Sequence, residues 1–245
     1  MLNENDKHCA TKEKTLNVLL KTIAFVSIVL LLSLLSIHFF AYDSTSVLNF
    51  DMVFFSICTY GFFKKELELA KFGFFWFIIV QILSMITFNA LSIYILSGFL
   101  IFFVWIGVFS LSRLKNQTFY FNKNIFKPFT FLHPKSKRVI GLISAFFLLL
   151  QFIPYNPHIA VLWVVIYIIS ILKGASEVAK VMLVLWAIPH IVSLGKTVYA
   201  ANSLLNAAIL TVIVFFVGHS VLLLMGISGV KEMNPKEINP LLFQN

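Results

Sequence analysis

Long apolar runs separated by short polar connections make up most of the chain. Most of the runs approach the roughly 20 helical residues that a hydrocarbon core about 30 Å thick requires. The apolar and polar residues do not alternate as they do in a barrel, and lipid leaves no partner for free backbone groups, so the runs are predicted to be helices. The predicted spans are approximately 16–41, 47–63, 72–88, 91–112, 139–155, 158–173, 178–195 and 203–228. The predicted fold class is therefore an all-α integral membrane protein with about eight transmembrane helices.

The second, fifth and sixth of these spans are short. The fifth and sixth meet at the double-proline segment 154–157, which ends helices sharply. A short span can thin the bilayer or enter it only partway. The alternative topology therefore has six spans, with residues 139–173 as a re-entrant hairpin that dips into the bilayer.

Positive charge determines the predicted orientation. The chain has 19 Lys and Arg residues, and with eight spans all of them except Lys196 fall on one side of the membrane. Loops rich in Lys and Arg stay in the cytoplasm, so both termini are predicted to be cytoplasmic. The predicted parts are a cytoplasmic tail at 1–15, a four-helix unit at 16–112, a cytoplasmic loop at 113–138, a second four-helix unit at 139–228 and a cytoplasmic tail at 229–245.

The loop at 113–138 combines basic and aromatic residues and contains no Asp or Glu. Aromatic side chains beside Lys and Arg are typical of a segment that lies on the headgroup layer of a membrane. We therefore expect this loop to rest on the cytoplasmic surface of the bilayer.

Composition points to lipid as the solvent of the chain. Hydrophobic residues make up 60% and charged residues only 12%, whereas a soluble domain carries about a quarter charged residues. The net charge of +9 could attract nucleic acid, but it lies in short loops beside the spans. The predicted partner is therefore the lipid bilayer, and nucleic acid is not a predicted partner. The abundance of Phe, Ile, Lys and Asn suggests a low-GC bacterium and hence its plasma (inner) membrane.

One segment recurs 109 residues later. Residues 64–71 (KKELELAK) correspond to residues 173–180 (KGASEVAK). The match favours two four-helix repeats that thread in the same direction, related by an axis along the membrane normal. Charges at i, i+4 and i+7 share a helix face, so they can pair with one another or contact an anion or a lipid headgroup. The candidate residues are Lys64, Glu68, Lys71, Lys173, Glu177 and Lys180.

Two histidines are the main polar candidates inside the predicted spans. At 1.5 Å per helical residue, His190 and His219 lie roughly 15 and 18 Å from the basic residues that flank their spans. They could meet on neighbouring antiparallel helices as a hydrogen-bonded pair, a substrate contact, or a haem or metal pair. The same intramembrane polar site could include Gln81, which aligns with His190 in the repeat, together with Asn202 and Asn206.

The predicted spans carry little reactive chemistry. No Asp or Glu lies deep within a span, which weakens ion-coupled transport and carboxylate catalysis, and no catalytic or phosphate-binding motif is present. Catalysis, a cofactor and a metal are therefore not predicted. Three classes remain. The first is a non-catalytic protein that contacts another membrane protein or a membrane-active toxin, as immunity and exclusion proteins do. The second is a carrier for a small neutral or lipid-like solute, and the third is a membrane haem protein or enzyme. The charge-free interior favours the first class, and the repeat favours the second.

Overall fold

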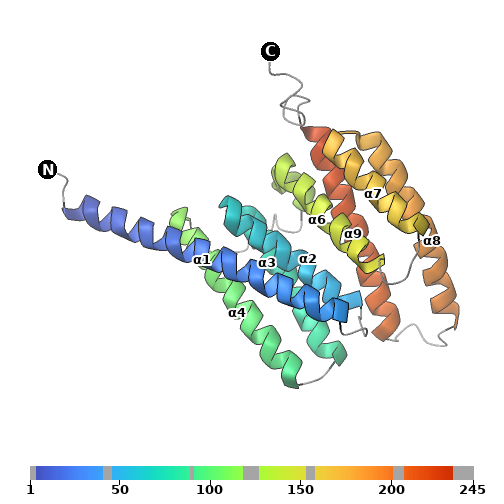
Figure 1. Cartoon of the computed structure of the whole chain (residues 1–245), viewed down its shortest axis with the longest axis horizontal. Helices are drawn as coiled ribbons and strands as arrows, with labels where there is room; N and C mark the ends of the chain where they lie inside the picture. The colour runs from blue at the N-terminus through green and yellow to red at the C-terminus, as the bar shows by residue number, and fades with distance from the viewer. Residues whose placement is uncertain are drawn as a thin grey trace, which may run out of the picture. The chain divides into compact units, whose positions relative to one another are not determined.

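The chain is helical throughout the part that the structure describes (Figure 1). This computed structural model describes the backbone of residues 4–40, 46–88, 91–117, 127–152, 158–200 and 207–233. Side chains are described at 11, 13–33, 51–83, 85, 94–117, 127–150, 161–188, 191 and 216–233. Within these ranges there is no strand, so the all-α prediction is confirmed for them.

The helices form two compact units, Met1–Phe126 and Lys127–Asn245. Unit 1 holds α1 (Glu4–Phe40), α2 (Ser46–Lys64), α3 (Leu67–Phe88) and α4 (Leu91–Leu114). Each of these helices packs on the next along the chain, and α1 also packs on α4, which closes the four into a bundle. Large buried side chains from α2, α3 and α4 fill its centre, among them Ile57, Phe72, Phe77 and Leu111.

Unit 2 holds the short α5 (Pro128–Phe131) followed by α6 (Pro134–Phe152), α7 (His158–Lys173), α8 (Ser176–Ala200) and α9 (Ala207–Glu232). Consecutive helices from α6 onward pack on one another, and α6 also packs closely along α9. The core of this unit gathers side chains from all four long helices, including Leu148, Tyr167, Trp186 and Leu223.

The turn between α2 and α3 has the same backbone geometry as the turn between α7 and α8. α2 ends at Lys64 and α7 at Lys173, 109 residues later, and α3 and α8 also begin 109 residues apart. The residue after each first helix has a positive φ, 56° at Lys65 and 78° at Gly174. Backbone hydrogen bonds with the same residue spacing close both turns. The sequence repeat is therefore matched by the same backbone geometry at the two turns. These bonds are Lys65 N to Phe62 O, Glu66 N to Gly61 O, Gly174 N to Ile171 O and Ala175 N to Ser170 O.

Residues 113–138, predicted as one connection, contain more helix than expected. α4 continues to Leu114, and its end is closed by the left-handed residue Asn116 (φ 51°). α5 lies within the predicted loop, and α6 begins at Pro134 rather than near residue 139. Proline is favoured at the first helical position because its missing N–H would have no helical partner there. The helix therefore begins about one turn before the apolar span predicted at 139–155, because helical structure does not have to stop where the apolar residues do.

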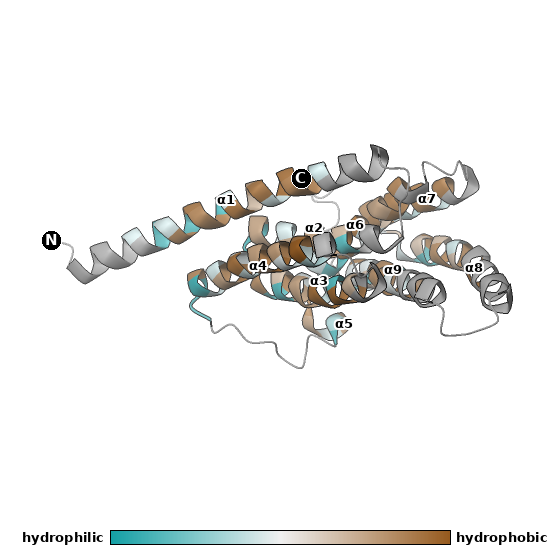
Figure 2. Cartoon of the chain, turned by 90° about the horizontal axis from the view of Figure 1, so that it is seen from below, coloured by the Kyte–Doolittle hydropathy of each residue, from teal (hydrophilic) through white to brown (hydrophobic). Residues whose placement is uncertain are grey.

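Among the residues whose side chains are described, two helices carry stretches that are long and apolar enough to cross a bilayer: Glu13–Ser33 of α1 and Tyr94–Leu114 of α4. α7 carries a shorter apolar stretch at Val161–Lys173. Figure 2 shows how strongly hydrophobic residues dominate the helices. Large apolar side chains on α1, α4 and α8 are exposed, for example Phe25, Phe102 and Val184. These features support a membrane protein.

Candidate functional site

His219, the one predicted site histidine whose side chain is described, lies between α9 and α6. Its Nδ1 and the hydroxyl oxygen of Ser144 form a hydrogen bond of 2.8 Å. Both residues are fully buried. The imidazole therefore links two helices of unit 2, which is the structural role weighed for it from the sequence.

Glycines bring the two helices close enough for that bond. A Cβ added at Gly141 would lie 2.5 Å from the Cα of Gly226, and one added at Gly226 would lie 2.6 Å from the Oη of Tyr167. One at Gly229 would lie 2.5 Å from the carbonyl oxygen of Pro134. Small residues that let helix backbones touch are typical of helix packing in membranes. α6 and α9 are therefore in backbone contact over several turns.

Tyr167 adds a third helix to this arrangement. Its hydroxyl donates a hydrogen bond of 2.7 Å to the carbonyl oxygen of Leu223 on α9. The tyrosine ring itself is buried on α7. The hydroxyl groups of Ser144 and Tyr167 and the Nδ1 of His219 thus form hydrogen bonds between neighbouring helices of the same unit.

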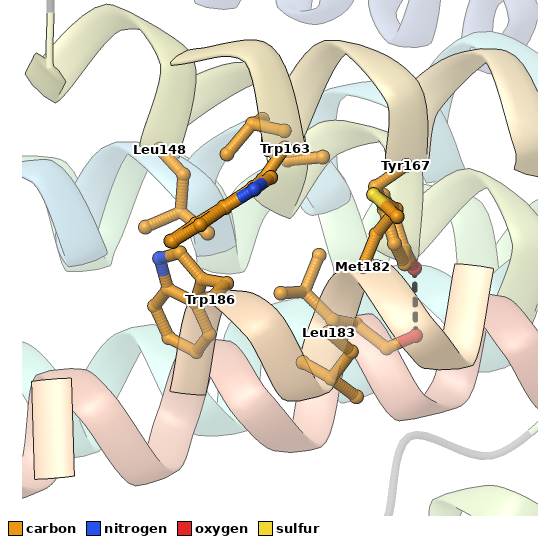
Figure 3. A pocket seen from close by; sticks show the side chains of 9 residues that line it. Leu148, Trp163, Tyr167, Met182, Leu183 and Trp186 are labelled. Atoms are coloured by element: carbon orange, nitrogen blue, oxygen red, sulfur yellow. Dashed lines mark hydrogen bonds between the residues drawn. The ribbon is translucent and has the colours of Figure 1, made fainter. Parts of the chain in front are cut away.

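Beside Tyr167 lies a small apolar cavity between α6, α7, α8 and α9. Figure 3 shows Trp163, Trp186 and Met182 pointing toward it. Its volume is about 10 Å³, which is about the space that one water needs, and Trp186 stacks on Phe216 beside it at 5.3 Å. This cavity is far smaller than the roughly 300–1,000 Å³ of a typical small-molecule site.

The other predicted intramembrane residues are only partly described. Gln81 is buried on α3 of unit 1. His190 lies on α8, which packs on α9, but its side chain is outside the described residues, as are Asn202 and Asn206. The proximity of His190 to His219 therefore stays a prediction. Among the described side chains, no group of three or more His, Cys, Asp or Glu could hold a metal ion.

The charged residues of the repeat form one ion pair in each unit. Lys71 Nζ lies 3.3 Å from Glu68 Oε1, and Lys180 Nζ lies 2.6 Å from Glu177 Oε1. The Lys71 side chain is only 7% exposed, whereas that of Lys180 is 42% exposed. The hydrogen bond and the charge of Lys180 lower the pKa of Glu177. These carboxylates therefore bind their own lysines, while Lys64 and Lys173 are exposed at the ends of α2 and α7.

A further charged contact, which sequence reasoning missed, lies between the start of α6 and the end of α9. Lys137 Nζ donates to both carboxylate oxygens of Glu232, at 2.8 and 2.6 Å, and Ser228 Oγ donates to Oε1 at 2.7 Å. Burial raises the pKa of Glu232, but the hydrogen bonds from Lys137 and Ser228 outweigh it, so the pKa lies below its usual value. The residues are 95 positions apart, so only the register of α6 against α9 could have revealed the pair.

Comparisons with known protein families, with curated proteins and with solved structures give no match to this chain.

Proposed function

We propose that the chain is a multi-pass protein of the bacterial plasma membrane. It has eight transmembrane helices in two four-helix repeats, with both termini in the cytoplasm. The long helices α1–α4 and α6–α9, the apolar stretches of α1 and α4, and the matching turns after α2 and α7 support this topology. The basic residues support the orientation, because with this topology all of them except Lys196 would lie on one side of the membrane.

Within that membrane, we propose a non-catalytic role based on contacts with another membrane protein or a membrane-active toxin, as in an immunity, exclusion or accessory protein. The supporting observation is that two buried polar contacts of unit 2 join neighbouring helices, Ser144–His219 between α6 and α9 and Tyr167–Leu223 between α7 and α9. Groups engaged in this way stabilise the bundle and are not offered to a solute.

An aromatic row on α4 is the surface that we propose for the contact. Phe102 stacks on Trp105 at 5.9 Å between ring centroids, and Trp105 stacks on Phe109 at 5.5 Å. Arg113 lies over the Phe109 ring at 5.0 Å. The stacked rings form a large surface with few free torsions, so little side-chain freedom is lost when a partner binds. Phe102 and Trp105 are exposed.

The exposed face of α8 provides a contrast on the same chain. Its exposed large hydrophobic side chains are aliphatic, for example Val181, Val184 and Ile188. Such side chains resemble lipid tails, so they give a partner helix no hydrophobic advantage over lipid. We therefore assign α8 to the lipid-facing surface and α4 to the partner-facing surface.

Photo-crosslinking in the native cells tests this assignment. p-Benzoylphenylalanine replaces Phe102 on α4 or, as a control, Val184 on α8. We expect a discrete protein adduct from position 102, lost when Trp105 and Phe109 are both changed to Leu, and lipid adducts from position 184. Equal lipid labelling at both positions would contradict the partner-facing role of α4.

A carrier for a small neutral or lipid-like solute is the second candidate. The matching turns after α2 and α7 support it, because transporters are often built from repeats. In a carrier that binds solute at His219, His219→Gln would abolish uptake while expression stayed normal. If His219 only links helices, the amide of Gln still bonds to Ser144 and function is kept. A haem protein, the third class, would show a Soret absorbance band after purification, which we expect to be absent.

A further inference from the structure

A basic hollow lies on unit 1 between α1 and the turn that joins α2 to α3. Its volume is about 560 Å³, and it is open on one side. Three lysines and one glutamate line it, which leaves a net charge of +2. The lining residues are Glu13, Lys14, Asn17, Val18, Lys21 and Lys65.

Lys65 occupies this hollow in an unfavourable backbone conformation. Its φ is 56°, in the left-handed region where glycine is favoured, and Gly174 fills the corresponding position of the other turn. A non-glycine residue there is strained by an amount that the surroundings must offset. Its Nζ donates a hydrogen bond of 2.7 Å to Asn17 Oδ1 on α1. The side chain thus reaches from the turn to α1, and its positive charge lines the same hollow as Lys14 and Lys21.

The hollow continues into an apolar stripe along α1. At 100° per residue, Lys14, Val18, Lys21 and Phe25 lie on one helix face, and Val18 and Phe25 are exposed. The same face continues through three further exposed residues, Ile28, Val29 and Leu32. From Lys21 to Leu32 the helix rises about 16 Å, close to the roughly 15 Å of one hydrocarbon leaflet. Figure 2 shows α1 passing from hydrophilic to hydrophobic residues along its length.

We propose that this hollow binds one anionic phospholipid of the cytoplasmic leaflet. The headgroup phosphate lies among Lys14, Lys21 and Lys65, and an acyl chain follows the stripe from Phe25 to Leu32. Basic pockets at the cytoplasmic ends of transmembrane helices are suited to anionic headgroups. The apolar stripe favours a lipid over free phosphate, because only the acyl chain of a lipid can pack against apolar side chains. This inference needs α1 to be in the membrane and is independent of any contact made by α4.

Native mass spectrometry of the full chain tests the lipid. The detergent-solubilised protein is titrated with dioleoylphosphatidylglycerol and, separately, with dioleoylphosphatidylcholine. We expect one phosphatidylglycerol to bind in preference to phosphatidylcholine. Removing one lysine charge with Lys21→Gln should weaken phosphatidylglycerol binding about fivefold. Lys115→Gln, which removes an exposed lysine at the end of α4, should leave binding unchanged.

A pair of glycine substitutions separates charge from backbone strain. Lys65→Gly removes the charge and keeps the left-handed turn, so it should also weaken binding about fivefold. Asn116→Gly relieves the same kind of strain at φ 51° and lies outside the residues that line the hollow, so binding should not change. Equal loss in both variants would overturn the proposal.

Two further results would also overturn it. Equal affinity for phosphatidylglycerol and phosphatidylcholine would show that the lysines do not select an anion. Displacement of phosphatidylglycerol by inorganic phosphate or by dihexanoylphosphatidylglycerol at equal concentration would show a phosphate site without a lipid chain.

Discussion

The hairpins α2–α3 and α7–α8 share the backbone of their turns but pack differently along their length. In the first hairpin, a Cβ added at Gly73 would lie 2.8 Å from the sulfur of Cys58. At the corresponding positions of the second hairpin stand Met182 and Tyr167, and both line the cavity of unit 2. Tyr167 bonds across to α9, and the glycine contacts of unit 2 lie between α6 and α9. The close contact at a glycine therefore lies between α2 and α3 in unit 1 but between α6 and α9 in unit 2, although the turns of the two hairpins match.

The turn and the helix interface are therefore determined by separate residues. The turn needs only a left-handed residue and the hydrogen bonds around it, which Lys65 and Gly174 both supply. The interface depends on where small residues lie, because only they let backbones approach. Exchanging residues between the two hairpins can test this separation.

The largest effect is expected from giving the first hairpin the residue of the second. Gly73→Met would place a Cβ 2.8 Å from Cys58 Sγ and 2.9 Å from the backbone nitrogen of Cys58, and the rest of the side chain has to be accommodated as well. We expect a loss of about 3 kcal/mol or more in the free energy of unfolding, measured by SDS titration in mixed micelles. The reciprocal Met182→Gly should cost about 2–3 kcal/mol by enlarging an existing cavity. A tolerated Gly73→Met would show that the hairpins do not differ in spacing.

A smaller loss is expected at the α6–α9 contact. Gly226→Ala places a methyl group 2.6 Å from Tyr167 Oη and 2.8 Å from the Cα of Gly141, so the helices must separate. We expect a cost of about 1–3 kcal/mol in the same titration. Gly98→Ala on α4 is the matched control, because nothing lies within 4 Å of the added atom. Alanine is about 1 kcal/mol better than glycine in a helix, so the control should be stabilised.

Two ion pairs in the described part of unit 2 differ in burial. Lys137 is 3% exposed and pairs with Glu232, whereas both partners of Lys180–Glu177 are exposed. Glu232→Gln should cost about 1–2 kcal/mol, less than a fully buried pair, because Glu232 itself is 42% exposed and screened by water. Glu177→Gln should have no measurable effect on unfolding.

The buried pair also predicts a pH dependence. The pKa of Glu232 is lowered on folding from a usual value of 4.5, so its contribution is complete above that pH. It is lost as the pH falls through the lower folded pKa. Wild type should therefore lose more stability than Glu232→Gln as the pH falls below 4.5. If the free energy of unfolding depended on pH in the same way in both proteins, the Lys137–Glu232 pair would not contribute to stability.

Sequence reasoning located the helices better than the contacts between them. The bounds of α7 follow from a local pattern, an apolar run flanked by proline and lysine. The recurrence of residues 64–71 at 173–180 indicates the two matching turns. The distance of His219 from Lys231 along its helix could be predicted because it depends only on helical rise. Its partner Ser144 could not be foreseen, since that pairing depends on how α6 and α9 align, which Gly141 and Gly226 decide through contacts between distant residues.

The smallest effect is expected at the turns themselves. Gly174→Lys should cost about 1 kcal/mol, because a side chain is disfavoured at φ 78°. The reverse change, Lys65→Gly, relieves a similar strain but loses the hydrogen bond to Asn17, worth about 0.5–1.5 kcal/mol. These terms oppose each other, so the net change should be under about 0.5 kcal/mol. In an Asn17→Ala background the hydrogen bond is already absent, and Lys65→Gly should then stabilise by about 1 kcal/mol. If Lys65→Gly gives the same gain in both backgrounds, Lys65 and Asn17 are not coupled, and the side chain of Lys65 does not compensate for its backbone.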